Sequence, residues 1–390
     1  MVIFLNCGWT STPYCVANEN RLIKVGAGFS ILKPSDAASI AANGDTIEIL
    51  AGTYRGDVAV WRQNNLTIRG IYGKARIEAN GRNAEGKGIW VIKGDNTTIE
   101  NIEFSGASVQ DRNGAGIRQE GSGLFVRNCY FHDNENGILA GANPTSKIVI
   151  ENTEFAHNGG GDGKTHNLYI GNVKSLTLRF CYSHHTQIGH NLKSRAQNNF
   201  ILYNRLMDEK TGTSSYIIDL SNGGRAFVIG NIIQQGPNAE NWHIISYGAE
   251  GLKYPENLLY IINNTMVNDR SSGVFIRVNQ KSTPAIIINN IFYGKGDILN
   301  GPGQQLTNLI ISESSLLGLS WDSSGFVNMS EFDYHLKSDS QAIDAGGDPG
   351  SYNGFRLLPV AEYLHPVSGR KRMVFKSIDI GAYEFIPLGN

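Results

Sequence analysis

The chain has 390 residues, of which 41% are hydrophobic and 18% charged, which excludes disordered and fibrous classes of protein. Its 34 lysines and arginines nearly balance its 35 aspartates and glutamates, so net charge alone indicates no class of partner. Glycine is abundant, with 46 residues, and favours many tight turns over long helices. No apolar run is long enough to predict a membrane-spanning segment.

The N-terminal region precedes the repetitive part of the chain. Residues 1–24 form a segment whose start, Met1-Val-Ile-Phe-Leu-Asn-Cys7, is as typical of a signal remnant as of an ordinary first strand. Residues 34–42 predict a short amphipathic helix with Ser35 or Asp36 as its N-cap. Such a helix would cover an exposed strand edge at this end of the fold.

A short pattern then recurs: two or three β-forming residues, an asparagine and a second apolar segment, as in residues 99–104 and 126–131. The marker position recurs at steps of 24 to 33 residues, at Asn101, Asn128, Asn152, Phe180, Asn204, Asn231, Asn264 and Asn290. Short strands at such a period cannot bury an apolar face alone, so they predict stacked coils. Asparagines at one corner of successive coils are expected to form a hydrogen-bonded ladder, interrupted at Phe180.

The repeat defines the fold and its extent. It fades after about residue 300, where the chain is predicted to form a C-terminal cap. We therefore expect one all-β domain over residues 25–385, a right-handed parallel β-helix (a single-stranded solenoid) with an N-terminal capping helix.

The cysteines fit this interpretation. Cys129 and Cys181 each follow a marker position and lie two coils apart, about twice ~4.8 Å, which is too far for a disulfide. We expect them to be buried free thiols. Cys7 and Cys15 could pair, but no feature of the sequence requires it.

Both ends of the repetitive region carry recognisable motifs. These are Gly44-Asp-Thr-Ile with Ala51-Gly-Thr-Tyr54, and Ala342-Ile-Asp-Ala-Gly346 with Asp379-Ile-Gly-Ala-Tyr-Glu384. Together with the coils, they resemble secreted bacterial proteins of the pectate-lyase-like superfamily over residues 25–385. The resemblance implies the fold and only suggests the chemistry, since this fold supports lyases, hydrolases, epimerases and adhesins.

Side chains at one register of each coil should stack into a column. The first strand of each coil aligns by its apolar residues, at Ile117, Ile138, Leu168, Leu192, Ile218 and either Ile244 or Ile245. Strand alternation turns the next residue outward. The predicted outward column is Arg118, Leu139, Tyr169, Lys193, Asp219 and Ser246, with Glu120, Arg195 and Ser221 two residues further along their strands.

Histidines precede these strands. His166 and His190 lie just before two of them, and His243 is similarly placed further on, next to Trp242, which we expect to stack on sugar rings. From residue 163 to 207 the chain has no aspartate or glutamate, but six lysines and arginines and four histidines. A cationic strip around proton-transfer groups favours an anionic ligand. His132 and His157, in contrast, are expected to be turn residues.

These residue types suit β-elimination from a uronic acid. The reaction needs cations to neutralise the carboxylate, a base for the C5 proton and an acid for the leaving O4. We predict Lys193, His190 and Tyr169 as catalytic. The predicted substrate-binding residues are Arg195, His166, Asp219, Arg118, His243 and Trp242. Cationic neighbours are expected to lower the pKa of Lys193.

The segment His190-Asn-Leu-Lys193-Ser194-Arg195, followed by an asparagine-containing coil, also resembles the lyases typified by chondroitinase B and alginate lyases. The resemblance implies that Lys193 is the base. That family has acidic calcium ligands just upstream and an Arg-His-Gly motif on its next coil, where this chain has Asp219-Leu-Ser-Asn-Gly-Gly224. We therefore predict a site without metal or other cofactor.

Other functions remain open at this point. A C5-epimerase would share the first proton abstraction, and a non-catalytic glycan-binding adhesin would need no base. A glycoside hydrolase needs two carboxyl groups. Asp219 has possible partners in Glu120, Asp208, Glu209 and Glu250, but none shares its column on an adjacent coil. The expected partner is an anionic polysaccharide, with no nucleic acid and no membrane. We expect a secreted or periplasmic bacterial protein; the oligomeric state is unknown, and we favour a monomer.

Overall fold

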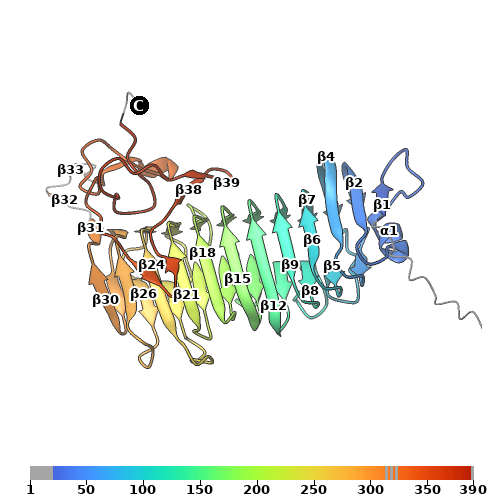
Figure 1. The fold of residues 1–390 in the computed structure, drawn as a ribbon, viewed down its shortest axis with the longest axis horizontal. Coiled ribbons are helices and arrows are strands. Elements are labelled where there is room, and N and C mark those ends of the chain that lie inside the picture. The colour runs from blue at the N-terminus through green and yellow to red at the C-terminus, as the bar shows by residue number, and fades with distance from the viewer. Residues whose placement is uncertain (1–20, 312–314, 317–318, 321–323, 388–390) are drawn as a thin grey trace, which may run out of the picture.

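The computed structural model describes residues 21–311, 315–316, 319–320 and 324–387. Cys7, Cys15 and most of the N-terminal segment lie outside these residues. In the described part, strands stack side by side along one long axis, with a helix at the N-terminal end and a C-terminal segment along one side (Figure 1). No helix among the described residues is long and apolar enough to cross a membrane.

Two large parallel sheets form the coils. The 10-stranded sheet contains β3 (Ala59–Trp61), β5 (Gly88–Ile92), β8 (Ala115–Gln119), β11 (Asn136–Ala140), β14 (Leu168–Ile170), β17 (Leu192–Ser194), β20 (Ile218–Leu220), β23 (His243–Tyr247), β26 (Val274–Val278) and β29 (Asp297–Asn300). Each of these strands pairs with the strand one coil away, which confirms the predicted parallel β-helix.

The 21-stranded sheet contains the other two strands of each coil. One row is β1 (Leu22–Val25), β2 (Thr46–Arg55), β4 (Thr67–Glu78), β6 (Thr97–Glu100), β9 (Leu124–Arg127), β12 (Asn143–Glu151), β15 (Val173–Arg179), β18 (Asn198–Leu202), β21 (Arg225–Ile229), β24 (Leu258–Ile262), β27 (Ala285–Ile288) and β30 (Gly303–Leu306). The other row is β7 (Ile102–Ser105), β10 (Tyr130–His132), β13 (Glu154–Ala156), β16 (Tyr182–His184), β19 (Arg205–Met207), β22 (Ile232–Gln235), β25 (Thr265–Asn268), β28 (Ile291–Gly294) and β31 (Leu309–Ile311). The rows are joined because the long strand β4 pairs with both β6 and β7.

The N-terminal capping helix is present as α1 (Pro34–Ile40). Its N-cap is Lys33, with Pro34 in the first turn, so the predicted cap at Ser35 or Asp36 is wrong. Proline suits this position because its missing N–H would have no partner inside the helix. The Ser35 hydroxyl and backbone N–H instead donate to the buried carboxylate of Asp57, which ties the helix to the chain just before β3.

The core is a column of stacked side chains inside the coils. Phe104, Phe131 and Phe155 lie on β7, β10 and β13 in register, with ring centroids 5.0 and 5.1 Å apart. Cys129 and Cys181 are buried free thiols, as predicted. Burial disfavours the charged thiolate and raises the pKa of each to about 12, so neither is a reactive group.

In four of the eight coils, the position of the asparagine ladder lies one residue after the marker position that the sequence predicted. Asn101, Asn128 and Asn152 occupy a corner with positive φ, as does Phe180. The ladder position is the residue after this corner, which is Ile102, Cys129, Thr153 or Cys181 in these four coils. Asparagine-to-asparagine bonds at this position join Asn204, Asn231, Asn264, Asn290 and Asn308 in the later coils. The sequence pattern did not separate the corner from the ladder position, because asparagine is favoured at both. At the corner it tolerates the left-handed backbone, and in the ladder its amide forms the hydrogen bonds.

The C-terminal segment packs along the outside of the coils. The coils themselves continue to Ile311, past the predicted boundary near residue 300. The segment contains β32 (Ser315–Leu316), β33 (Leu319–Ser320), β34 (Phe326–Asn328), the 3-10 helix η1 (Met329–Glu331), β35 (Asp333–Leu336), β36 (Ser351–Tyr352), β37 (Phe355–Arg356), β38 (Ala361–Leu364) and β39 (Ser368–Lys371). Asn152 donates to the Val367 carbonyl and Tyr203 accepts from the Val360 N–H. The described part of this segment therefore packs on the 21-stranded sheet, whereas the predicted outward column belongs to the 10-stranded sheet.

Candidate active site

The predicted outward column exists on the 10-stranded sheet. Arg118 pairs with Leu139, Leu139 with Tyr169, Tyr169 with Lys193 and Lys193 with Asp219, each one coil apart. Asp219 in turn pairs with Ser246, and Ile218 with Ile245, which decides between the two alignments left open by the sequence. Tyr169, Lys193 and Asp219 therefore lie on three successive strands, β14, β17 and β20.

Lys193 lies at the centre of the site. Its Nζ is 2.9 Å from Asp219 Oδ2 and 2.9 Å from Glu250 Oε1. The lysine side chain is 12% exposed and that of Asp219 only 2%, so this pair is shielded from solvent. Burial alone would lower the pKa of Lys193, but the two carboxylates raise it above its usual value. The expectation of a lowered pKa is thus wrong, because its neighbours are anionic.

Asp219 is held as a buried carboxylate by three donors. Besides Lys193, its Oδ2 accepts from Ser221 Oγ at 2.6 Å and lies 3.5 Å from His190 Nε2. Burial would raise the pKa of Asp219, but the bonds and charges of His190 and Lys193 lower it far below its usual range. Its second oxygen, Oδ1, has no hydrogen-bond partner among the described residues although it is buried.

Glu250, which the sequence offers only as a possible partner of Asp219, is a member of the site. It lies beyond the end of β23 and reaches back to bridge Lys193 Nζ and Arg195 Nη2, the latter at 2.6 Å from Glu250 Oε2. Its side chain is 43% exposed, so it is the outermost group of the cluster. The bridge shows that Lys193 and Arg195 together can hold one carboxylate at the surface of the groove.

Arg195 also contacts Tyr169. Its Nη1 donates to the phenolic oxygen at 2.7 Å, and the guanidinium lies over the ring, 5.4 Å from its centroid. Since the oxygen of Tyr169 accepts this bond, its own proton remains free for donation to a ligand oxygen. The Tyr254 hydroxyl lies within hydrogen-bond distance of both the Arg195 carbonyl and Asn172 Oδ1, so this side chain supports the strand.

The histidines form a second column beside the first. His166 and His190 are stacked with centroids 4.6 Å apart, Tyr216 follows at 5.1 Å, and His243 lies 6.1 Å beyond Tyr216. Tyr216 was not predicted, although it precedes Ile218 by the same two residues that separate His190 from Leu192.

Backbone N–H groups fix the orientation of both buried imidazoles. His190 N donates to His166 Nδ1, and Tyr216 N donates to His190 Nδ1. In the neutral rings the proton is therefore on Nε2, which in His190 faces Asp219. Burial and the nearby charges of His190 and Lys193 lower the pKa of His166 well below its usual value, so it is neutral near pH 7.

The remaining predicted residues lie at the ends of the groove. Leu139 separates Arg118 from Tyr169, which places Arg118 about 10 Å from it along the column. Arg118 Nε is 3.9 Å from Glu120. Trp242 is 60% exposed and its ring is 6.1 Å from that of His243. These side chains do not join the central cluster, but they flank it on the face where a long chain would lie.

A cavity of about 310 Å³ lies elsewhere, between the 21-stranded sheet and the C-terminal segment. Its lining includes Phe200, Phe227 and Phe355 with Lys174 and Arg225. None of the predicted site residues borders it. It is a second place where an acidic sugar could contact aromatic and cationic groups, but it lacks paired proton-transfer groups.

Comparisons with known proteins agree with the fold of the coils. A family profile described as right handed beta helix region matches residues 57–233. The chain has the fold of a right-handed parallel β-helix. The crystal structure of pectate lyase Pel9A superposes on this β-helix with a TM-score of 0.62 and 14% identity, covering 94% of this chain and 96% of that one.

Two further solved structures are less similar. An alginate lyase from Paenibacillus sp. str. FPU-7 has 14% identity and a TM-score of 0.44, covering 75% of this chain and 99% of that one. A pectin methylesterase has 8% identity and a TM-score of 0.36, covering 78% of this chain and 91% of that one. No curated protein sequence matches significantly. At these identities the comparisons establish the fold of the β-helix and leave its chemistry to be argued from its own residues.

Proposed function

We propose that this β-helix cleaves a uronate-containing polysaccharide by β-elimination on the outer face of β14, β17 and β20. The observation that carries the proposal is the bridged carboxylate of Glu250, held by Lys193 and Arg195. A uronate carboxylate has the same charge and shape and would be bound by the same two cations. The flat, open face of the coils suits an extended chain.

The reaction would proceed through a carbanion stabilised by the bound carboxylate. Arg195 lies where a uronate carboxylate would be neutralised, which lowers the cost of the charge that develops when C5 loses its proton. Lys193 is uncharged at this step, because it acts as the base. The C5–H bond breaks and its proton passes to the base. The C4–O4 bond then breaks, its electron pair leaves on O4, and O4 takes a proton from the acid. A C4–C5 double bond remains on the new non-reducing end.

The position of each residue in the site indicates its proposed role as base, acid or positioning residue. Lys193 is proposed as the base, as its resemblance to the chondroitinase B type implies, and it must first lose a proton that Asp219 and Glu250 stabilise. Tyr169, whose own proton is free, is proposed as the donor to O4. His190 is proposed as a positioning residue, because its Nε2 faces Asp219 and its Nδ1 is occupied by a backbone N–H.

Glycoside hydrolysis is the second candidate, because Asp219 and Glu250 both contact Lys193 and so lie within the range known for paired carboxyl groups. A hydrolase, however, needs one of the two protonated near neutral pH, and therefore a raised pKa. The pKa of Asp219 and that of Glu250 are both lowered, in spite of burial, by their bonds to Lys193 and other donors. Elimination accounts better for this charge distribution.

A screen of acidic polysaccharides tests the proposal. The protein is incubated with pectate, alginate and glycosaminoglycans, and ultraviolet absorbance reports the unsaturated product. We expect one class of substrate to give an absorbance rise that Lys193→Ala abolishes. His190→Ala should reduce turnover less, because it acts through Asp219. If Lys193→Ala leaves the turnover of a confirmed substrate unchanged, the proposed site is wrong.

The partner and the location follow from the reaction and are proposed with it. An acidic polysaccharide is too large to enter a bacterial cell intact, so a secreted or periplasmic enzyme would meet it. The site lies within one chain, and its described residues contribute every group assigned here, so a monomer would suffice.

A further inference from the structure

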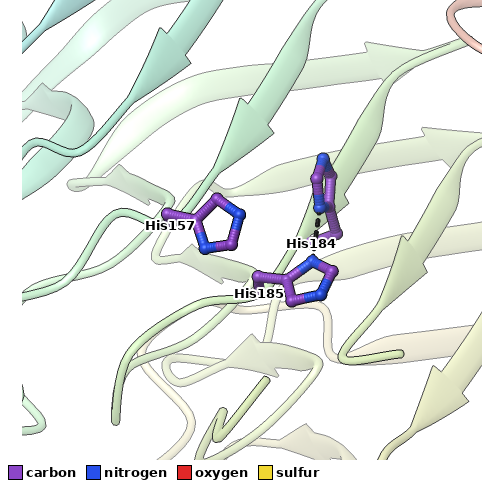
Figure 2. A group of neighbouring side chains, drawn as sticks. All are labelled: His157, His184 and His185. Atoms are coloured by element: carbon purple, nitrogen blue, oxygen red, sulfur yellow. Dashed lines mark hydrogen bonds between the residues drawn. The ribbon is translucent and has the colours of Figure 1, made fainter. Parts of the chain in front are cut away.

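Three histidines gather at a corner of the β-helix outside the groove. His184 is on β16, and His157 and His185 directly follow β13 and β16 (Figure 2). Ala156 pairs with His184 across the two strands, so His157 and His185 begin equivalent turns on neighbouring coils. Both have a left-handed backbone, with φ of 54° and 50°. His157 is thus the turn residue that the sequence predicts, but its ring also faces two others.

The three rings converge on one point. A nitrogen from each lies within 4.8 Å of the others, and among the residues that the structure describes this is the one such group of histidine, cysteine or acidic side chains. Tetrahedral Zn²⁺ with bonds of about 2.0–2.1 Å needs its nitrogen ligands about 3.3 Å apart. His184 is held in place by stacking on Tyr182 at 4.0 Å. To reach this spacing, exposed His157 would rotate toward the pair and His185 would turn away from His184, since their Nδ1 atoms are 2.6 Å apart.

The contacts of the rings leave their inner nitrogens facing one another. His184 Nε2 is 3.2 Å from Glu154 Oε1, and His185 Nε2 is 3.8 Å from Glu209 Oε2. A carboxylate only accepts, so His184 carries its proton on Nε2 and its Nδ1 presents a lone pair. His185 Nδ1, 2.6 Å away, can donate to this lone pair. A bound cation would take the place of the proton shared by the two nitrogens.

We propose that His157, His184 and His185 bind a divalent transition-metal ion of the Zn²⁺ class. Imidazole ligands select such ions over Ca²⁺ and Mg²⁺, which prefer oxygen. Glu154 and Glu209 lie behind the two ligand rings, in the arrangement by which carboxylates orient metal-binding histidines. Their two negative charges also match the charge of the ion.

The fourth coordination position faces solvent. His157 borders a depression of about 240 Å³ whose lining includes Asp133 and Glu135, which give it an acidic rim. An ion enters from this side, and water completes its coordination. Because its ligands come from two successive coils, the bound ion joins these coils outside the hydrogen-bonded sheet.

Calorimetric titration of the untagged, chelator-treated full-length protein with Zn²⁺ tests the site. We expect one ion per chain, no binding of Ca²⁺ and a raised thermal midpoint with Zn²⁺. His157→Ala, at an exposed position, should weaken binding by at least about 100-fold, and Glu154→Gln by about 10- to 100-fold. With Co²⁺, the wild type should show the visible bands of a tetrahedral nitrogen site.

His132→Ala is the matched control. His132 lies one coil from Ala156 in the same row, contacts Glu103 and Asp133, and is outside the cluster. It should bind Zn²⁺ like the wild type, as should Lys193→Ala, so the result is independent of the proposed lyase activity. Absence of saturable Zn²⁺ binding, or equal binding by His157→Ala and the wild type, would overturn the proposal. Circular dichroism without metal verifies that His157→Ala is folded.

Discussion

Removal of the Glu250 carboxylate should increase the affinity of the site for an acidic oligosaccharide. Glu250 occupies the position proposed for the substrate carboxylate, at 2.9 Å from Lys193 Nζ and 2.6 Å from Arg195 Nη2. A substrate must break both ion pairs before it binds. Glu250→Ala removes this competition and leaves Lys193 and Arg195 in place.

The magnitude follows from the exposure of the pair. Glu250 is 43% exposed, and exposed ion pairs contribute about 0.2–1 kcal/mol each. Two such pairs cost the substrate about 0.4–2 kcal/mol to displace. With about 1.4 kcal/mol for each factor of ten, the KM of Glu250→Ala should be about two- to thirtyfold lower. The difference should shrink at high salt, which screens these exposed charges.

Steady-state kinetics on a confirmed oligouronide measure this effect. Glu256→Ala is the control, because Glu256 is 57% exposed and pairs with Arg225 at 3.5 Å, away from the groove. Its KM should equal that of the wild type. A higher KM for Glu250→Ala would refute the competition. A loss of kcat with unchanged KM would instead assign Glu250 to the chemistry, as hydrolysis requires.

Three further outcomes are expected. The turnover should rise with pH above neutrality, because Lys193 acts as the base only after losing the proton that Asp219 and Glu250 stabilise. Asp219→Asn removes one of these two carboxylates and should therefore move the rise to lower pH. Both effects are measured as kcat against pH. Asn231→Ala removes four buried hydrogen bonds and should lower the free energy of unfolding by about 4 kcal/mol in urea, whereas exposed Asn238→Ala should change it little. Trp242→Ala should raise the KM for long chains more than for short ones, because Trp242 lies at one end of the groove.

Local rules were enough to predict most of the fold and the centre of the site. Strand alternation gave the outward register, and the coil spacing placed Tyr169 next to Lys193 and Lys193 next to Asp219. Strand alternation depends only on neighbouring residues, and coil spacing depends only on the repeat, so both can be read directly from the sequence. The same rule could have placed His157 beside His185, because Ala156 and His184 share a register position.

Residues on loops were not accessible in this way. Glu250 follows Lys193 by 57 residues and returns from beyond β23, two coils along. No periodicity constrains the path of that loop, so neither the contact of Glu250 with Lys193 nor the direction of the pKa shift of Lys193 could be predicted. The ladder was misplaced for a different reason, since asparagine is favoured at two adjacent corner positions.

The mass of the cleaved product tests the central claim most directly. Eliminative cleavage of a uronate chain adds no water, so its new non-reducing end is lighter by one water than the product of hydrolysis. The β-helix incubated with its acidic polysaccharide should give oligosaccharides of this lower mass, which Lys193→Ala does not form. Products that carry the added water, with no ultraviolet absorbance, would contradict elimination and would favour Asp219 and Glu250 as a hydrolytic pair.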